Sequence, residues 1–368
     1  MPYAPDIRND IVQKDTITTS GSGAGNTVNI GFKPSFVHSY GTEGTDGGFL
    51  FGEPTGLKLI DADSVSLVSD DSNAITSYVA NGFVHGTSNK FTINNKQTIF
   101  NCWKGSGNTG AVDTSGTITA NVSANASVGF SLTKYTGTGS AGATIPHGLG
   151  KKPEVIQFIP ISEAESGIMA VEVPNRNEMK FANGDVFIGG LGTGGTDAKA
   201  QRTNVLNSTD PTKTLITLGT NGGCNKNNQS FLAIAWRSVK GVSKAGFYHG
   251  VGNASHNMNV FIYTGFKPGL IFIKNMTTGS TPFNVFNLLY HINDNNSGGR
   301  RFTNPKGQDI SFAGGTANGR DTDIYMFSNG FRIGNQDNTM GGAGQNYFYI
   351  AWAHEALVST NNIPTVGV

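Results

Sequence analysis

One phrase occurs three times along the chain, and it constrains the fold more than any other feature of the sequence. In each copy a glycine-containing turn leads to a proline, and a strand-like apolar run follows. The copies are Gly31-Phe32-Lys33-Pro34 before SFVHSY, Gly148-Leu149-Gly150-Lys151-Lys152-Pro153 before EVIQFI, and Gly265-Phe266-Lys267-Pro268 before GLIFIK. A phrase that recurs at such a spacing indicates three copies of one structural unit.

The three tryptophans of the protein fall in matching places, one in each copy. Each ends an apolar run typical of a buried strand: TIFNCW ends at Trp103, FLAIAW at Trp236 and FYIAW at Trp352. We interpret the tryptophans as core residues of their units, and Pro34, Pro153 and Pro268 as turn residues that remove no ladder hydrogen bond. Replacing Trp236 by alanine is therefore expected to unfold the second unit.

The composition favours strands joined by tight turns. Glycine accounts for 51 of the 368 residues, about twice its usual share of roughly 7%. Charged residues make up only 14%, and Gly, Asn, Ser and Thr are the residues of short loops between strands. ANGFVH at 80–85 and SNGFRI at 328–333 each contain Asn-Gly, which is the strongest short signal for a β-hairpin turn.

We therefore predict an all-β fold of three tandem antiparallel β-sandwich units, jelly-roll-like, with an extended N-terminal arm. The expected organisation is an arm over 1–15, a first unit over 16–104, a linker or strand excursion over 105–130, a second unit over 131–240, a third unit over 241–357 and a C-terminal tail over 358–368. Within the excursion, TITANVSA alternates as a strand does, so this segment is expected to be an ordered arm or an extra strand pair.

The charge balance argues against two classes of partner. The chain has 26 basic and 25 acidic residues, and its longest basic runs are the pairs Lys151-Lys152 and Arg300-Arg301. Nucleic acid and acidic membranes are poor candidates, because their binding depends on clustered positive charge. No apolar stretch reaches the roughly 18 residues of a membrane span, and the N-terminus shows no signal-peptide pattern.

The residues that could carry catalysis or bind metal form no convincing pattern. Acidic clusters at 61–64, 70–71, 292–294 and 320–323 lie among turn formers, where Asx turns explain them. His147, His249 and His256 fit no HExxH motif, and Cys102 and Cys224 form no zinc-binding pair. The glycine-rich GSGAG and GTGGTD lack the GK[ST] of a phosphate-binding loop. We therefore expect neither an enzyme nor a cofactor or metal site.

The run DTSGTITANVSANASVGFSLTKYTGTGSAGATIPHGLGKKPEVIQFI, residues 113–159, resembles a repeat found in virion structural proteins of tailed bacteriophages. A Ser-Ala-Asn turn, GFS, YTGxGSAG and HGLGxxP carry the resemblance. YTGFKPGLIFIK and the IAWA strand of the third unit are similar to it, and the first unit shares only IGFKP, ANGF and the strand of Trp103. The resemblance implies a β-rich structural protein on the outside of a phage particle, made in the host cytoplasm, and it brings no catalytic residues.

Three functions from different classes remain open. The first is a short tail fibre or tail-associated host-recognition component, whose loops would contact host cell-surface glycans through Tyr40, Tyr290, Asn295 or Arg300. The second is a capsid decoration or cement protein, in which the arm and the excursion would join neighbouring subunits. The third and most remote is a glycan depolymerase, which would need two carboxylates across a groove.

We also expect a homo-oligomer that contacts other virion proteins. Strand edges in an all-β chain need a cover, and this chain has few charges with which to protect them. A homotrimer is the favoured state, because cyclic symmetry reuses identical edges, and because the resemblance implies threefold appendages. Residues 1–15 and 105–130 are expected to lie at the contacts between subunits or with another virion protein.

Overall fold

The protein is almost entirely β-structure. The computed structural model describes residues 11–18, 26–41, 49–52, 59–61, 74–87, 97–106, 110–163, 167–175, 178–181, 186–188, 199–200, 202–252, 260–276, 284–287, 324–333 and 341–353. Within these ranges every paired strand is antiparallel to its neighbour. The helices of the same ranges are α1 (Arg202–Leu206) and α2 (Gly222–Asn225); neither is long and apolar enough to span a membrane. The expected all-β fold is confirmed.

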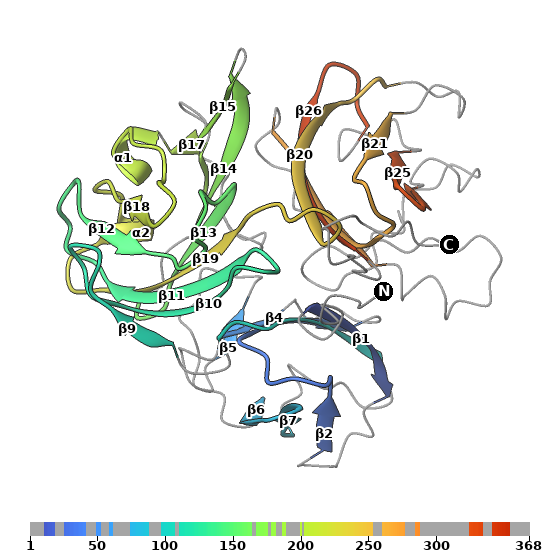
Figure 1. Cartoon of the computed structure of the whole chain (residues 1–368), viewed down its shortest axis with the longest axis horizontal. Helices are drawn as coiled ribbons and strands as arrows, with labels where there is room; N and C mark the ends of the chain where they lie inside the picture. Colours follow the sequence, from blue (N-terminus) through green and yellow to red (C-terminus); the bar gives the residue numbers. More distant parts are fainter. Residues whose placement is uncertain are drawn as a thin grey trace, which may run out of the picture.

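The first copy of the repeated phrase lies in two sheets, which we call the first repeat (blue in Figure 1). The larger sheet has the order β1 (Ile11–Thr18), β8 (Gln97–Trp103), β3 (Phe36–Gly41), β4 (Phe49–Gly52) and β5 (Leu59–Asp61). The smaller has the order β2 (Asn26–Asn29), β7 (Gly82–His85) and β6 (Ile75–Val79). Residues 11–15, expected in the N-terminal arm, instead belong to β1, which pairs with β8.

The second repeat (green) has the largest sheet. Its order is β17 (Lys199–Ala200), β16 (Val186–Ile188), β14 (Ile168–Asn175), β13 (Val155–Pro160), β19 (Ser230–Trp236), β11 (Phe130–Thr136), β10 (Ala120–Asn125) and β9 (Ala111–Asp113), and β15 (Glu178–Phe181) pairs with β14. The smaller sheet consists of β12 (Thr144–Pro146) and β18 (Leu215–Thr217). The excursion at 105–130 thus supplies β9 and β10, an extra strand pair on this sheet.

The third repeat (orange to red) has a larger sheet in the order β20 (Ser243–His249), β26 (Asn346–Ala353), β22 (Pro268–Asn275) and β23 (Asn284–Asn287). Its smaller sheet has the order β21 (Phe261–Tyr263), β25 (Gly330–Ile333) and β24 (Ile324–Phe327). The same strand order therefore occurs in all three larger sheets: β1-β8-β3-β4, β11-β19-β13-β14 and β20-β26-β22-β23.

The register of these sheets follows the repeated phrase residue by residue. Each tryptophan lies opposite the residue that comes two positions after the proline of its own copy; the pairs are Trp103 with Phe36, Trp236 with Val155, and Trp352 with Leu270. The prolines come just before a strand or at its first residue, where a missing N–H is tolerated. The phrase therefore specifies where the turn ends and which residue the tryptophan faces.

The glycine of the phrase has a structural reason in each copy. Gly31, Gly148 and Gly265 have φ values of 85°, 68° and 84°, in the left-handed region that favours glycine. The residue that follows is buried each time, as Phe32, Leu149 and Phe266. The turn thus redirects the chain from the smaller sheet to the larger one and places an apolar anchor between them.

The larger sheets are buried on both faces, which explains their continuous apolar runs. Along β19, Phe231, Ala233 and Ala235 face the smaller sheet of their own repeat, whereas Leu232, Ile234 and Trp236 face the other way. β8 and β26 divide their side chains between the same two directions. The second direction leads to a core that all three repeats share.

We call this shared cluster the central core. Its largest members come from all three repeats: Phe36, Trp103, Phe130, Leu132, Ile234, Trp236, Leu270, Phe272, Phe348, Ile350 and Trp352. Figure 1 shows the three repeats arranged around this common centre. The tryptophans were expected in the core of each unit, and they are buried, but they pack between the repeats.

The three indole rings contact one another in a closed triangle. The ring centroids of Trp103 and Trp352 are 5.3 Å apart, and the other two pairs are 6.3 Å apart. The interplanar angles lie between 66° and 69°, so ring edges meet ring faces, which is a favoured arrangement of aromatic pairs. Among the described residues the buried indole N–H groups have no hydrogen-bond acceptor, and edge-to-face packing lets an N–H group interact with a neighbouring ring instead.

The two Asn-Gly sites form hairpin turns, but one residue earlier than expected. The loops are Ala80-Asn81 and Ser328-Asn329, and the glycines Gly82 and Gly330 are already the first paired residues of β7 and β25. In both turns the asparagine carbonyl accepts two backbone hydrogen bonds from the strand ahead of the repeated phrase, from Ile30 and Gly31 and from Thr264 and Gly265. The hairpins therefore fix the start of each phrase.

Candidate binding site

The side chains that the sequence suggested for receptor contact lie outside the described part of the structure. Tyr40 belongs to β3, and its side chain lies outside the described part, as do Tyr290, Asn295 and Arg300. Most of the acidic clusters and both glycine-rich loops also lie outside it. Within the described ranges no group of three or more His, Cys, Asp or Glu side chains could hold a metal ion.

Cys102 and Cys224 are both free and buried, one in the core of the first repeat and the other in that of the second. Burial raises the pKa of both thiols, since an apolar surrounding disfavours the thiolate. Neither therefore has the exposed, low-pKa character of a reactive cysteine.

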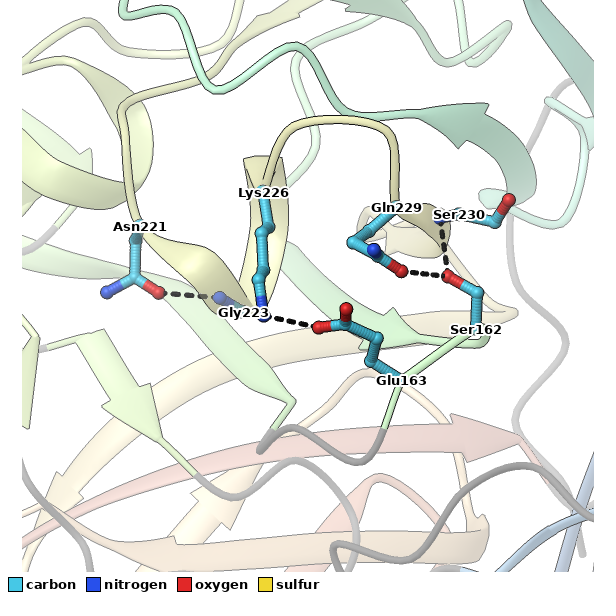
Figure 2. A network of polar contacts seen from close by, with 7 residues as sticks. All are labelled: Ser162, Glu163, Asn221, Gly223, Lys226, Gln229 and Ser230. Carbon is cyan, nitrogen blue, oxygen red and sulfur yellow. Dashed lines mark hydrogen bonds and ion pairs between the residues drawn. The ribbon is translucent and has the colours of Figure 1, made fainter.

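A polar network beside α2 has a structural role (Figure 2). Lys226 forms an ion pair with Glu163, and Ser162 donates to Gln229 and accepts from the backbone N–H of Ser230. These contacts hold the segment before β19 against the end of β13. The ion pair is partly exposed to solvent, and ion pairs at the surface contribute little to stability.

The YTGTGSAG motif is explained by one buried side chain in the same region. The carboxamide of Asn225 accepts from the N–H of Thr138 and donates to the carbonyls of Ser140 and Gly219. Two of these hydrogen bonds go to the loop and the third goes to Gly219 after β18, so this glycine-rich loop closes on an asparagine of its own chain.

His147, in HGLG, also has a structural role. Its Nδ1 accepts from the N–H of Leu149, which leaves Nε2 to donate to the carbonyl of Thr212. Burial lowers the pKa of this imidazole below its ordinary value of 6.5. The third repeat has Thr264 at the same position, and its hydroxyl accepts from Phe266 in the same way.

We predict that His147 makes stability depend on pH. Because its folded-state pKa is lowered, the unfolded chain binds the proton more readily, and stability falls as the pH drops below about 6.5. Thermal unfolding measured from pH 7.5 to 5.5 checks this. His147→Thr, which copies the third repeat, should keep the turn and flatten the curve; identical curves for both proteins would contradict the role of His147.

A pocket lies at the junction between the second and third repeats. Its volume is about 440 Å³, and its lining comes from the loop before β13, the β19–β20 connection, β20 and the residue after β21: Glu154, Ser238, Lys240, Ser243, Lys244, Ala245, Gly246, Phe247 and Thr264. This volume lies within the usual range of small-molecule sites, roughly 300 to 1,000 Å³.

The wall of the pocket is held in place by hydrogen bonds. The Glu154 carboxylate accepts from both the N–H and the hydroxyl of Ser238, and the Ser238 hydroxyl accepts from the N–H of Ala245. The hydroxyl of Ser243 donates to the carbonyl of Arg237. A ligand would therefore meet a preformed wall.

Two lysines give the pocket its cationic character. Lys240 is exposed, and within the described residues its ammonium has no partner. Lys244 is half-buried and donates to the carbonyl of Tyr263 at 2.6 Å. Partial burial lowers the pKa of Lys244, because an ammonium loses hydration there.

An exposed aromatic strip begins beside Lys244 and crosses the outer face of the small sheet of the third repeat. It consists of Tyr263 and Phe261 on β21, Phe327 on β24 and Arg332 on β25. Tyr263 is 59% exposed, Phe261 45% and Phe327 41%. Lys244 Nζ lies 5.3 Å from the Tyr263 ring centroid, and the Arg332 guanidinium 5.9 Å from that of Phe327. Pocket and strip thus form one continuous surface, with Lys244 between them.

The strip is specific to the third repeat. Aligning the repeats on the residue before the phrase glycine places Tyr263 opposite Asn29 and Pro146, and Phe261 opposite Thr27 and Thr144. The other repeats form their small sheets without aromatic residues there. Folding therefore does not require the exposed rings, and exposed aromatic clusters of this kind indicate contact with a ligand or partner.

Sequence reasoning missed this surface, although a signal for it was present. In NVFIYT the alternation predicts that Phe261 and Tyr263 share a face opposite to Ile262. Alignment with the equivalent segments of the other repeats, NTVNI and ATIPH, shows that only the third repeat has aromatic residues at these two positions.

The geometry defines a β-repeat protein with a shared tryptophan core and a surface pocket between the second and third repeats. The chain belongs to the family described as Domain of unknown function (DUF7483), whose profile matches residues 13–356. No curated protein and no solved structure matches the chain.

Proposed function

We propose that the chain is a structural protein on the outside of a tailed bacteriophage particle, acting as a short tail fibre or tail-associated host-recognition component. We further propose that its three repeats are tandem jelly-roll-like β-sandwich units. The sequence motifs at 113–159 support the first proposal, and the threefold recurrence of one strand order supports the second. The proposal assigns no enzymatic activity to the chain.

The observation that carries host recognition is the aromatic strip next to the pocket. Two repeats keep small or polar residues where the third exposes Phe261 and Tyr263. Aromatic rings beside hydrogen-bonding groups suit cell-surface saccharides, whose C–H faces pack on rings while their hydroxyls find polar partners. The third repeat is therefore the proposed contact with the host.

A capsid decoration protein is the second candidate, and the arrangement around the central core favours it. Three similar units around one centre match a threefold position of a symmetric shell, so a single chain would meet three identical neighbours there.

Labelling virions with an antibody against the purified chain and imaging them tests the location. We expect label at the tail and reduced adsorption to host cells when the purified protein is added first. Label over the head would favour decoration, and unlabelled particles would overturn both candidates.

The homotrimer remains a prediction, and the structure sharpens its test. Deleting residues 1–15 would remove part of β1, so the deletion that leaves the sheet intact is 1–10. We expect the full chain to have the mass of three copies in sedimentation, and the truncated chain to have the mass of one. Equal masses for the two would refute the role of the arm.

A further inference from the structure

We propose that the pocket and the aromatic strip together bind an acidic saccharide, with the acidic group at Lys240 and Lys244 and a neighbouring sugar ring on the strip. This inference rests on the proposed saccharide contact of the third repeat and adds the charge of the ligand. It is carried by the distribution of charge around the pocket and by the position of Lys244 between pocket and strip.

Among the described residues of this surface, the cations outnumber the anions. Lys240, Lys244 and Arg332 contribute positive charge, and Glu154 is the carboxylate of the pocket lining. That carboxylate is already bound by two hydrogen bonds from Ser238, and Arg237 is its charged neighbour. An incoming anion therefore meets two lysines in the pocket lining, and the one carboxylate of that lining is already engaged by Ser238 and lies near Arg237.

Lys244 is placed to bind an anion with little reorganisation. Its ammonium is held by the Tyr263 carbonyl and lies over the Tyr263 ring, so one of its donors is used and the side chain is fixed. A half-buried ammonium has lost part of its hydration, and a carboxylate or phosphate beside it replaces what was lost.

The strip supplies the second half of the site. Phe261 and Phe327 pack edge to face with centroids 5.7 Å apart, which leaves ring surface open next to the outer side of Tyr263. One sugar ring fits a pocket of about 440 Å³, and the adjoining ring of an oligosaccharide then lies over aromatic side chains. A neutral ligand would use the strip alone, whereas an acidic one would use both parts.

Titration calorimetry of the full chain with trigalacturonate, with its fully methyl-esterified form and with galactose 6-phosphate tests the proposal. The ester keeps the sugar backbone but replaces each carboxylate by an uncharged methyl ester, and the phosphate separates a carboxylate preference from a general preference for anions. We expect trigalacturonate to bind about tenfold or more tightly than its ester, and to weaken as sodium chloride is raised. Equal affinity for acid and ester would overturn the acidic preference and leave the saccharide contact standing; no binding of any probe would overturn both.

The repeats themselves provide matched variants. Tyr263→Asn and Phe261→Thr introduce the residues of the first repeat and should weaken binding of acid and ester alike. Lys240→Ser and Lys244→Ser should reduce the ratio between the two affinities to about one; for Lys244 the substitution copies Ser131 of β11. Lys213→Ser, at an exposed lysine just before β18, is the control and should change nothing.

A second copy of the chain is the alternative occupant of the strip. If Tyr263→Asn changed the sedimentation mass while wild-type protein bound no saccharide, the strip would be a subunit contact and the proposal would fail.

Discussion

Replacing Trp236 by alanine is expected to destabilise all three repeats together. Truncation of a buried tryptophan costs about 3 to 5 kcal/mol, a large part of the total stability of a typical domain, roughly 5 to 15 kcal/mol. Trp236 contacts both Trp103 and Trp352, so the cavity would open in the core that joins the repeats. The expectation from sequence, loss of the second unit alone, is therefore replaced by loss of the shared core.

Calorimetry together with hydrogen exchange distinguishes the two outcomes. We expect a single transition at lower temperature and faster exchange in β8 and β26 as well as in β19. Two separated transitions, with exchange raised only in the second repeat, would show that the repeats fold independently. Lys213→Ala, at an exposed residue, serves as the control, because surface substitutions usually change stability by no more than about 0.5 kcal/mol.

The second large effect is expected at the paired glycines of the hairpins. A Cβ at Gly82 would lie 1.9 Å from the Val28 carbonyl oxygen, and one at Gly330 would lie 2.2 Å from that of Ile262. Both contacts are with the backbone of the neighbouring strand, so β2 or β21 would have to move. Overpacking of this kind typically costs about 1 to 3 kcal/mol.

Gly82→Ala and Gly330→Ala should therefore both lower the denaturation midpoint, with Ser328→Ala in the adjacent turn as the near-neutral control. Gly330→Ala should in addition weaken saccharide binding, since its Cβ would lie 2.8 Å from the Phe261 ring. If Gly330→Ala were as stable as the wild type, the close approach of β21 and β25 would be wrong.

The same glycines show how far local sequence rules reach. Asn-Gly correctly marked two hairpins, because turn residues act over a few positions. The rule places the glycine inside the loop. In the structure each glycine is instead the first paired residue after the loop, where it allows the close approach of the strand that precedes the repeated phrase. That strand is about 50 to 70 residues away in sequence, so a turn rule contains no information about it.

The tryptophans show a second limit. Their burial was evident from FLAIAW and FYIAW, but a continuous apolar strand has two buried faces and does not say what covers each. Val155 and Leu270 pair with two of the tryptophans. Such apolar residues are compatible with a core inside one unit and equally with a core shared by three units. Only the packing of the sheets, which depends on contacts far apart in sequence, separates these arrangements. The pocket could not be predicted from the sequence for the same reason, because Glu154 and Thr264 line it from different repeats.

Joining three similar units in one chain also changes how the protein can diversify. In a ring of three identical subunits every substitution appears three times. A residue that improves binding but packs poorly therefore destabilises such an assembly at three places. Here Phe261 and Tyr263 occur once while Thr27 and Asn29 keep the equivalent positions in the first repeat. Each chain then carries a single strip, so the expected homotrimer would carry three. Strong attachment would have to come from many molecules displayed on one particle, because the overall avidity rises steeply with the number of sites that are bound at once.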